Sequence, residues 1–320
     1  MNSFQNWGLK KIEQTVMDKK EVYFSLFKDF QEKKFDEEMK KHTSILLGGR
    51  ADVFISPKDV KELQKVLKII NENDLPVFIL GEGTNIIVSD NGIRGVVINL
   101  KKGFSDIQIT SYKEKLILKS GAGLKMSDLI HFCIEKGFSG LEGGTGIPGS
   151  IGGALVMNAG TKSWEIGDIV KSITLMDYQG KIFNIAKKDI QFSYRSSNLP
   201  YEGIVLDVDI SLKKGNKDTI RDIFLKNLKK RKKTQPISSP SAGSIFKNLQ
   251  NIAAGKLIDG LGLKGYCIGD AEISRLHANY IINKGRASAK DVICLIEYIE
   301  EKVFQETGIT LEREVCIVGK

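Results

Sequence analysis

Residues 140–160 read GLEGGTGIPGSIGGALVMNAG, with eight glycines in twenty-one positions and no tandem repeat. Six of these glycines and Pro148 fall within the eleven residues that start at Gly143. Glycine allows positive φ and close approach of the backbone, so that consecutive N–H groups can converge on a phosphate. Thr145 and Ser150 add hydroxyl donors. The stretch therefore indicates a loop that cradles a phosphate-bearing ligand.

A second glycine loop, GEGTN, occupies residues 81–85 between two predicted strands. Neither loop matches GxGxxG opening a helix, which makes a Rossmann dinucleotide site a poor fit, and the Walker pattern is absent. Taken alone, GEGTN is equally typical of a plain tight turn. Two such loops in one chain suit a pyrophosphate and its flanking sugars.

Composition indicates a globular protein of about two domains, since 320 residues exceed the usual size of roughly 150 residues per domain. Hydrophobic and charged residues make up 41% and 27% of the chain, and no apolar run is long enough for a membrane span. The start MNSFQNWGLKKIEQ lacks the pattern of a secretory signal, so we expect a cytoplasmic protein. The cysteines are widely separated and predict reduced thiols rather than a metal site or disulfides: Cys133, Cys267, Cys294 and Cys316.

The net charge of +9 is concentrated in one segment, because KNLKKRKK at residues 226–233 carries six of the positive charges and leaves +3 elsewhere. This segment ends a helical pattern, where basic residues complement the negative end of the helix dipole. A solvated helix end is therefore favoured over a nucleic-acid patch, although contact of some of these cations with phosphates stays open.

Hydrophobic periodicity and turn residues divide the chain into three parts. Residues 1–41 are expected to form a helical arm packed on the body. Residues 42–214 form two lobes, 42–103 and 104–214, and a C-terminal domain follows at 215–320. Helices are expected at 56–74, 126–137, 218–233 and 288–308, strands at 75–80, 86–90, 95–100, 106–110, 115–120 and 203–214, and a hairpin at 172–185 with its turn at 178–180.

Several segments together resemble one protein family in their order and spacing. They are HTSILLGGRADVFISP, ILGEGTNIIVSDNGIRGVVINL, the opening glycine stretch, FSYRSSNLP, PSAGSIFKN and LEREV. The chain after residue 41 resembles the UDP-N-acetylenolpyruvoylglucosamine reductases of bacterial peptidoglycan synthesis. The glycine loops are shared with a wider class of FAD enzymes that resemble p-cresol methylhydroxylase and vanillyl-alcohol oxidase, whereas FSYR, AGSIFKN and LEREV select the reductase.

The resemblance implies a mixed α/β (α+β) fold, in which a two-lobed FAD-binding domain is followed by a C-terminal α/β substrate domain. It implies noncovalent FAD and NADPH as reducing co-substrate. The reduced flavin passes a hydride to the enolpyruvyl double bond of a UDP-sugar, and addition of a proton gives UDP-N-acetylmuramate. Neither a metal, a nucleic acid, a membrane nor an obligate protein partner is implied.

Three residues match the family's catalytic positions. Hydride addition to an alkene conjugated with a carboxylate builds negative charge on that carboxylate, which calls for a positioned cation, and Arg195 in FSYR matches it. Ser244 in AGSIF matches the proton donor, and a serine needs polar partners to act as an acid. Glu314 in LEREV matches the catalytic glutamate, for which we expect a raised pKa.

The binding residues implied by the resemblance fall in the glycine loops and in AGSIFKN. Lys247 and Asn248 match positions near the sugar nucleotide, and both are equally plausible as plain surface residues. The matched FAD positions are Gly81, Gly83, Thr84, Asn85, Gly144, Thr145, Ile147, Pro148, Gly149, Ser150, Gly153 and Asn158.

The chain departs from the family pattern at a few places. Leu249 stands where many relatives have Pro, and Cys267 and Cys316 replace residues that are often arginine. Only SSNLPYEG separates FSYR from the next strand, so the chain resembles a shorter subclass without an inserted tyrosine loop. An FAD-linked oxidase of the same superfamily with another substrate stays open as an alternative.

Overall fold

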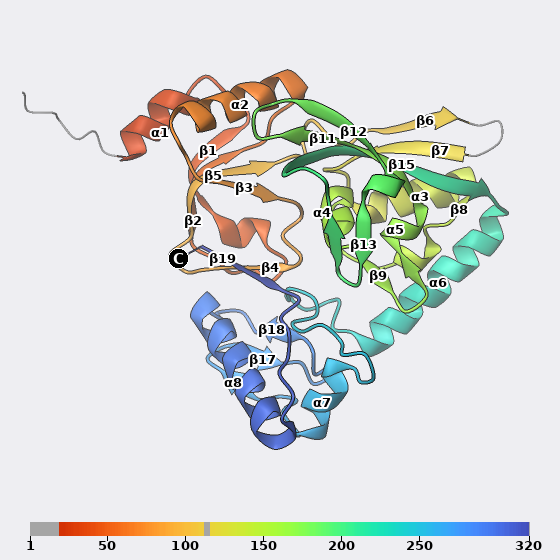
Figure 1. Ribbon diagram of the computed structural model, residues 1–320. Coiled ribbons are helices and arrows are strands. Elements are labelled where there is room, and N and C mark those ends of the chain that lie inside the picture. The colour runs from red at the N-terminus through yellow and green to blue at the C-terminus, as the bar shows by residue number, and fades with distance from the viewer. Residues whose placement is uncertain (1–18, 112–115, 320) are drawn as a thin grey trace, which may run out of the picture.

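The computed structural model describes residues 19–111 and 116–319 (Figure 1). The first lobe is built on a four-stranded sheet in the order β1-β2-β5-β3, in which only β1 runs antiparallel to its neighbour. Two helices lie over this sheet at the top of the view in Figure 1. The elements are α1 (Lys19–Phe27), β1 (Lys33–Glu38), η1 (Met39–His42), β2 (Arg50–Ile55), α2 (Val60–Glu72), β3 (Val77–Leu80) and β5 (Ile93–Asn99).

The sequence explains why α2 forms where it does. Asp59 caps the helix, because its Oδ1 accepts a hydrogen bond of 2.8 Å from the Glu62 N–H. Leu63, Leu67 and Ile70 are buried at helical spacing and pack into the main core. The predicted helix at 56–74 is thus confirmed, with a shorter span.

The second lobe is an antiparallel sheet of the order β12-β11-β15-β7-β6, with β8 paired to the end of β15. One apolar core runs through both lobes and joins residues of α2 to residues of α3 and β15. The elements are β6 (Ile107–Ser111), β7 (Leu116–Gly121), α3 (Met126–Lys136), β8 (Phe138–Ser139), α4 (Ile151–Val156), α5 (Ile166–Ile169), β11 (Val170–Asp177), β12 (Ile182–Ala186), η3 (Lys187–Asp189) and β15 (Gly203–Lys214).

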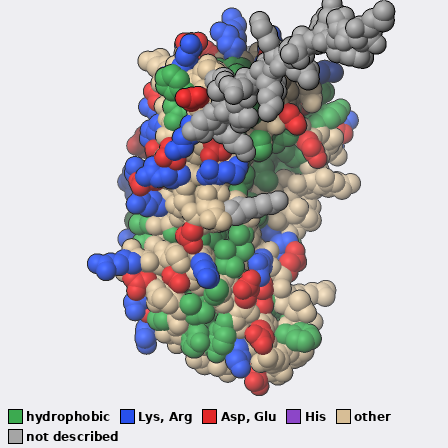
Figure 2. All heavy atoms as spheres, turned by 90° about the vertical axis from the view of Figure 1, so that its left-hand side faces the viewer, with side chains coloured by type: hydrophobic (Ala, Val, Ile, Leu, Met, Phe, Trp, Pro, Cys, Tyr) green, Lys and Arg blue, Asp and Glu red, His purple; other side chains and the backbone are tan. Residues whose placement is uncertain are grey.

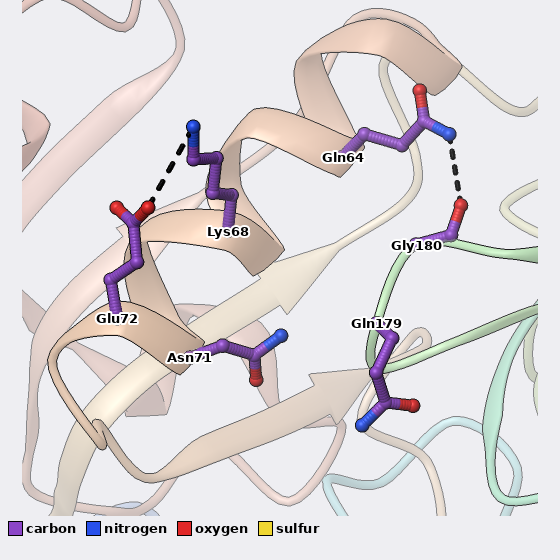
Figure 3. A pocket seen from close by; sticks show the side chains of 6 residues that line it. All are labelled: Gln64, Lys68, Asn71, Glu72, Gln179 and Gly180. Atoms are coloured by element: carbon purple, nitrogen blue, oxygen red, sulfur yellow. Dashed lines mark hydrogen bonds and ion pairs between the residues drawn. The ribbon is translucent and has the colours of Figure 1, made fainter.

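The tip of the β11–β12 hairpin also ties the two lobes together at their surface (Figure 3). The Gln64 side-chain amide donates to the Gly180 carbonyl at 2.9 Å, and that of Asn71 donates to the Tyr178 carbonyl at 2.6 Å. A shallow polar hollow of about 360 Å³ lies between α2 and the tip. None of the predicted site residues lines it, so its contacts serve to join the lobes.

Charged side chains cover the first lobe without separating by sign. Figure 2 shows acidic and basic side chains interspersed on the face that it presents. Surface ion pairs account for part of this mixture, such as Arg94 with Asp52 at 2.6 Å and Arg50 with Glu38 at 3.0 Å. Exposed pairs of this kind contribute little to stability.

The C-terminal domain packs a three-stranded sheet against two helices. A capping box at Ser288 and Asp291 begins α8, and the helix expected at 288–308 is confirmed. The core of this domain also takes in Ile45, Leu47 and Ile87 from the first lobe. The helix α6 (Lys217–Thr234) leads from β15 into this domain, whose elements are α7 (Ala254–Gly260), β16 (Cys267–Ile268), β17 (Ala271–Ile273), β18 (Ile281–Asn283) and α8 (Ala289–Thr307).

The last strand returns to the first lobe. β19 (Cys316–Val318) pairs in parallel with β4 (Ile86–Val88), which follows the first glycine loop directly. The Cys316 N–H donates to the Asn85 carbonyl at 3.0 Å. This pairing brings the LEREV segment next to the loop at residues 81–85.

Two expectations about the ends of the two-lobed domain need correction. Within the predicted arm, residues 1–18 lie outside the described residues and 19–27 are helical, but 33–38 form the edge strand β1 of the first sheet. The sequence places α6 in the C-terminal domain, yet this helix packs against α3 and β8, and its Ile220 lies in the core that joins the two lobes. The apolar face of α6 is thus covered by the second lobe.

Candidate active site

The two glycine loops meet in space, although about sixty residues separate them. The Thr84 hydroxyl reaches the Pro148 carbonyl at 3.5 Å. A Cβ on Gly81 would lie 2.6 Å from the Ser150 Oγ, so a side chain there would press into the other loop. Gly149 adopts a φ of +128°, and the nearest atom to a Cβ on it would be the Thr84 Oγ1 at 3.2 Å. The two loops form one cradle, whose shape depends on the absence of a side chain at Gly81 and at Gly149.

Several polar side chains predicted to bind the cofactor have partners inside the protein. The Thr145 hydroxyl donates to the Glu142 carbonyl at 2.7 Å. The Ser150 Oγ caps α4 by accepting from the Gly153 N–H at 3.2 Å. The Asn85 amide donates to the Glu314 carbonyl at 3.0 Å. These side chains shape the loops.

Asn158 also has partners for its side chain inside the protein. It is fully buried, and its amide nitrogen donates to Glu165 Oε2 at 2.7 Å and to the Ser193 carbonyl at 2.9 Å. Its Oδ1 accepts from the Gly167 N–H at 3.1 Å. The side chain therefore braces the FSYR segment, and its contact with FAD stays a prediction.

Arg195 lies in the two-residue turn between β13 (Gln191–Ser193) and β14 (Ser196–Asn198), with a φ of +57°. Its Nε donates to Glu314 Oε1 at 3.0 Å, and its Nη2 donates to the Gly160 carbonyl at 3.0 Å. The guanidinium also lies over the Tyr194 ring, 4.9 Å from the ring centroid. Its Nη1 is buried without a hydrogen-bond partner among the described residues. One oriented donor is thus left for another group.

The loop that carries Arg195 is supported by short elements around Trp164. The Trp164 indole N–H donates to the Gly140 carbonyl at 2.8 Å, and a Cβ on Gly144 would press on the Trp164 ring. This packing explains the role of Gly144 in the glycine stretch. The elements are η2 (Glu142–Gly144), β9 (Gly160–Thr161) and β10 (Trp164–Glu165).

Glu314 is held between the two domains with only 15% of its side chain exposed. Burial raises the pKa of its carboxyl above the usual value of 4.5, and the opposing effects of Arg195 and Lys247 are smaller. A raised pKa makes the protonated carboxyl easier to reach than it is for an exposed glutamate. The expectation drawn from the family resemblance therefore agrees with the environment of this residue.

Ser244 lies on the segment that faces the cradle from the C-terminal domain. Its neighbour Gly243 adopts a φ of +77°, and a Cβ there would lie 3.5 Å from the Thr84 carbonyl. The Ser44 hydroxyl donates to the Ser241 carbonyl at 2.6 Å and so ties this segment to the first lobe. The structure thus brings Ser244, Arg195 and Glu314 to the same region as the glycine loops.

Lys247 and Asn248 sit at the outer side of the same segment. The Lys247 ammonium pairs with Glu312 at 2.6 Å, and 72% of the Glu312 side chain is exposed. The Asn248 Oδ1 accepts from the Ala254 N–H at 3.1 Å, in the first turn of α7. The Asn248 N–H donates to the Tyr194 Oη at 3.3 Å, which links the two domains beside Arg195.

Two kinds of site are not found in the part of the chain that the structure describes. No helix there is long and apolar enough to cross a membrane. Nor is there a group of three or more His, Cys, Asp or Glu side chains arranged to hold a metal ion.

Both halves of the chain match known protein families. Residues 51–186 match the FAD binding domain family, and residues 235–318 match the C-terminal domain of UDP-N-acetylenolpyruvoylglucosamine reductase. The UDP-N-acetylenolpyruvoylglucosamine reductase of Clostridium novyi is 39% identical over 97% of this chain and 96% of its own length. That of Oceanobacillus iheyensis is 42% identical over 89% and 92%. The crystal structure of the reductase from Thermus caldophilus is 34% identical, with a TM-score of 0.77, and covers 90% of this chain and 98% of its own.

The chain belongs to the UDP-N-acetylenolpyruvoylglucosamine reductase family. Membership confirms the predicted fold class, an FAD-binding domain of the p-cresol methylhydroxylase type followed by the C-terminal domain of the reductases. It also identifies the chain as a flavoenzyme and an oxidoreductase of peptidoglycan synthesis. The cradle formed by the glycine loops is the place where the residues present fit a flavin dinucleotide.

Reasoning from the sequence missed two residues beside this candidate site. Arg231 belongs to the basic run that was interpreted as a solvated helix end, but it turns inward, and its Cδ would lie 3.0 Å from a Cβ on Gly146. Its helical spacing from Phe224 and Leu228 places it on the packed face and could have marked it. Tyr280 is only 7% exposed and interacts with both Ser244 and Arg231. No local pattern in the sequence marks Tyr280.

Proposed function

We propose that the chain reduces the enolpyruvyl group of UDP-N-acetylenolpyruvoylglucosamine to give UDP-N-acetylmuramate, with NADPH as the source of electrons. The observation that carries this proposal is the Arg195–Glu314 pair, which leaves one buried guanidinium donor free beside the glycine cradle. Such a donor suits a substrate whose carboxylate gains negative charge during the reaction.

FAD would be held noncovalently between the loops at residues 81–85 and 144–150. When bound, FAD accepts a hydride from NADPH and delivers it to the substrate alkene. Gly81 and Gly149 keep the cradle open, and the hydroxyl of Thr84 lies between the loops. The remaining protein groups bind, orient and protonate the substrate.

Arg195 would bind the carboxylate of the enolpyruvyl group through its free Nη1. Its other nitrogens are fixed by Glu314 and by the Gly160 carbonyl, so the guanidinium needs little reorganisation when charge develops. Arg195 thereby stabilises the enolate-like state that hydride addition creates.

Glu314 would take part as a protonated acid. Burial raises the pKa of its carboxyl, so the neutral form can lie beside the substrate carboxylate without repelling it. In that form it donates a hydrogen bond toward the developing charge while its other oxygen keeps the bond from Arg195.

Ser244 would supply the proton to the carbon next to the carboxylate. Lys247 and Asn248, on the same segment, would contact the sugar nucleotide from the outer side. We further assign the chain to the shorter subclass without a tyrosine loop, because β14 is separated from β15 by only a few residues. The proposal needs a UDP-sugar as partner, and no nucleic acid, membrane or obligate protein partner.

Replacing Ser244 with Ala tests this assignment, because flavin reduction by NADPH needs no protein proton donor and substrate reduction does. Anaerobic stopped-flow mixing of prereduced Ser244→Ala enzyme with the UDP-enolpyruvyl sugar should show reoxidation slowed by about 10²- to 10⁴-fold. Flavin content and bleaching by NADPH should stay near wild type.

Two results would contradict the proposal. A rate of reoxidation equal to that of wild type would leave Ser244 as a structural residue of its loop. Wild-type enzyme whose reduced flavin is reoxidised by oxygen but not by the UDP-enolpyruvyl sugar would instead favour an FAD-linked oxidase acting on another substrate.

A further inference from the structure

Ser244 cannot act as an acid without help, because a hydroxyl is far less acidic than groups with a pKa near neutral pH. The segment that carries it runs antiparallel to the segment of β18. Ser241 bridges Ile282, and the Asn283 N–H donates to the Pro240 carbonyl at 2.9 Å. Continuing this register places Ser244 opposite Asn279, the residue before Tyr280.

Asn279 fixes this register with three hydrogen bonds. Its carbonyl accepts from the Ile245 N–H at 2.9 Å and its Oδ1 from the Phe246 N–H at 3.0 Å. Its side-chain amide donates to the Phe246 carbonyl at 2.8 Å. The backbone on either side of the Ser244–Tyr280 contact is therefore rigid.

Tyr280 is the buried partner of Ser244. The side chain interacts with Ser244 and with Arg231, and its ring centroid lies 5.1 Å from that of His277. Burial raises the pKa of the phenol, and Glu314 raises it further, while Arg231 and Ser244 lower it. Burial outweighs these lowering effects, so the phenol keeps its proton at neutral pH and has one to pass to Ser244.

Arg231 is the second polar neighbour of Tyr280. Its Nε donates to Gln235 Oε1 at 3.0 Å, and its stem packs on Gly146 of the second glycine loop. Among the described residues, no carboxylate lies within ion-pair distance of this guanidinium. Burial lowers the pKa of Arg231, and the interaction with Tyr280 opposes that effect. A negative charge on the phenol would supply the counter-charge that this cation lacks.

We propose that Tyr280, supported by Arg231, positions the Ser244 hydroxyl and returns a proton to it during substrate reduction. The inference rests on the proposed function. As the Ser244 O–H bond breaks, a C–H bond forms at the substrate carbon. The phenol O–H of Tyr280 then breaks as the Ser244 O–H re-forms. The phenolate lies beside the Arg231 guanidinium and regains its proton from water.

The test uses flavin-loaded Tyr280→Phe, which keeps the ring and removes only the hydroxyl. Anaerobic mixing of the prereduced variant with the UDP-enolpyruvyl sugar should show reoxidation slowed by about 10- to 100-fold. This is less than the loss expected for Ser244→Ala, because Ser244 stays in place. The solvent deuterium isotope effect on reoxidation should reflect two moving protons in wild type and one in the variant. Flavin reduction by NADPH should not change.

Two further variants serve as controls. Tyr266→Phe removes a phenol from a stacked pair elsewhere in the C-terminal domain, where the ring centroid lies 4.4 Å from that of Tyr298. It should reoxidise at the wild-type rate. Arg231→Gln should slow reoxidation, and adding it to Tyr280→Phe should cause little further loss, since the two residues act as one unit.

The outcomes separate this inference from the proposed function. If Ser244→Ala is slow and Tyr280→Phe is as fast as wild type, the role of Tyr280 is refuted and the proposed function stands. If Tyr280→Phe also loses flavin or slows its reduction by NADPH, Tyr280 is a structural residue and the inference is wrong. If Ser244→Ala itself matches wild type, the proposed function fails first.

Discussion

Arg195 occupies an unusual conformation for a residue with a side chain. A positive φ outside glycine costs about 1–3 kcal/mol and persists only where the surroundings hold it. Here the hairpin pairing of β13 with β14, the bond to Glu314 and the bond to the Gly160 carbonyl hold it. The strained turn lets the guanidinium project between the two domains, which supports a role in the reaction rather than in the fold.

Asn158 shows what a matched motif does not reveal. The sequence placed it in the glycine stretch, and the resemblance assigned it to FAD. In the structure its amide instead reaches the Ser193 carbonyl, next to the turn of Arg195. A pattern of residue types records that a position matters, but the direction of a side chain depends on contacts that are distant in the sequence.

The raised pKa of Glu314 predicts a change in stability with pH. The native state keeps a proton on this carboxyl at pH values where the unfolded chain has lost it. From the usual 4.5 up to the raised pKa, the unfolded state therefore binds fewer protons, and the free energy of unfolding falls as the pH rises. Glu314→Gln cannot titrate and should escape this loss. In urea denaturation, the free energy of unfolding of the variant minus that of wild type should increase from pH 4.5 toward neutral pH.

Glu312→Gln is the matched control for this measurement. It removes a carboxylate two residues away, from a side chain that is 72% exposed. Because it keeps Glu314, Glu312→Gln should lose stability toward neutral pH as wild type does. The same loss in Glu314→Gln would show that burial does not raise the pKa of Glu314.

At the scale of elements, the sequence predicted what local periodicity controls. The helix α2 and the β11–β12 hairpin follow directly from apolar spacing and from the turn at residues 178–180. The strand β1, KKFDEE, was missed because five of its six residues are charged and it forms an edge whose only partner is β2. The parallel pairing of β19 with β4 depends on contacts across more than two hundred residues and has no local signal.

The glycine cradle yields a prediction about Gly149. Replacing it with Val forces a β-branched side chain into a φ of +128° beside Thr84. The strain should cost on the order of 1–3 kcal/mol, and the side chain should fill the cradle. Purified Gly149→Val should contain less flavin than wild type and take up less added FAD, as measured by the flavin-to-protein absorbance ratio.

Gly285→Val is the control, because it introduces similar backbone strain at a glycine outside the two glycine loops. Gly285 has a φ of +139° and no atom within 4 Å of a Cβ, and it lies in the loop between β18 and α8. It should lose a similar amount of stability in urea but keep its flavin. Equal flavin content in the two variants would remove Gly149 from the cofactor site.

At the scale of the whole molecule, the site lies where the two domains are tied together. The Asn283 amide donates to the Ile45 carbonyl at 3.0 Å, and the Asp90 carboxylate accepts from the Ala289 and Lys290 N–H groups at the start of α8. The Asn85 amide donates to the Glu314 carbonyl at 3.0 Å. These hydrogen bonds therefore fix the glycine loops of one domain relative to Ser244 and Glu314 of the other.

A ligand bound where the two domains meet should stabilise both of them at once. The paired loops and the absence of a matched attachment residue predict that FAD is noncovalent, so acid precipitation should leave the flavin in the supernatant. Because noncovalent FAD binds only the folded chain, it should add about 2.7 kcal/mol of stability at about 100 times its Kd. The Tm of the flavin-free protein should accordingly rise with added FAD in a single transition. Yellow colour retained in the acid pellet would show a covalent link, and a Tm independent of FAD would show that the cradle does not hold it.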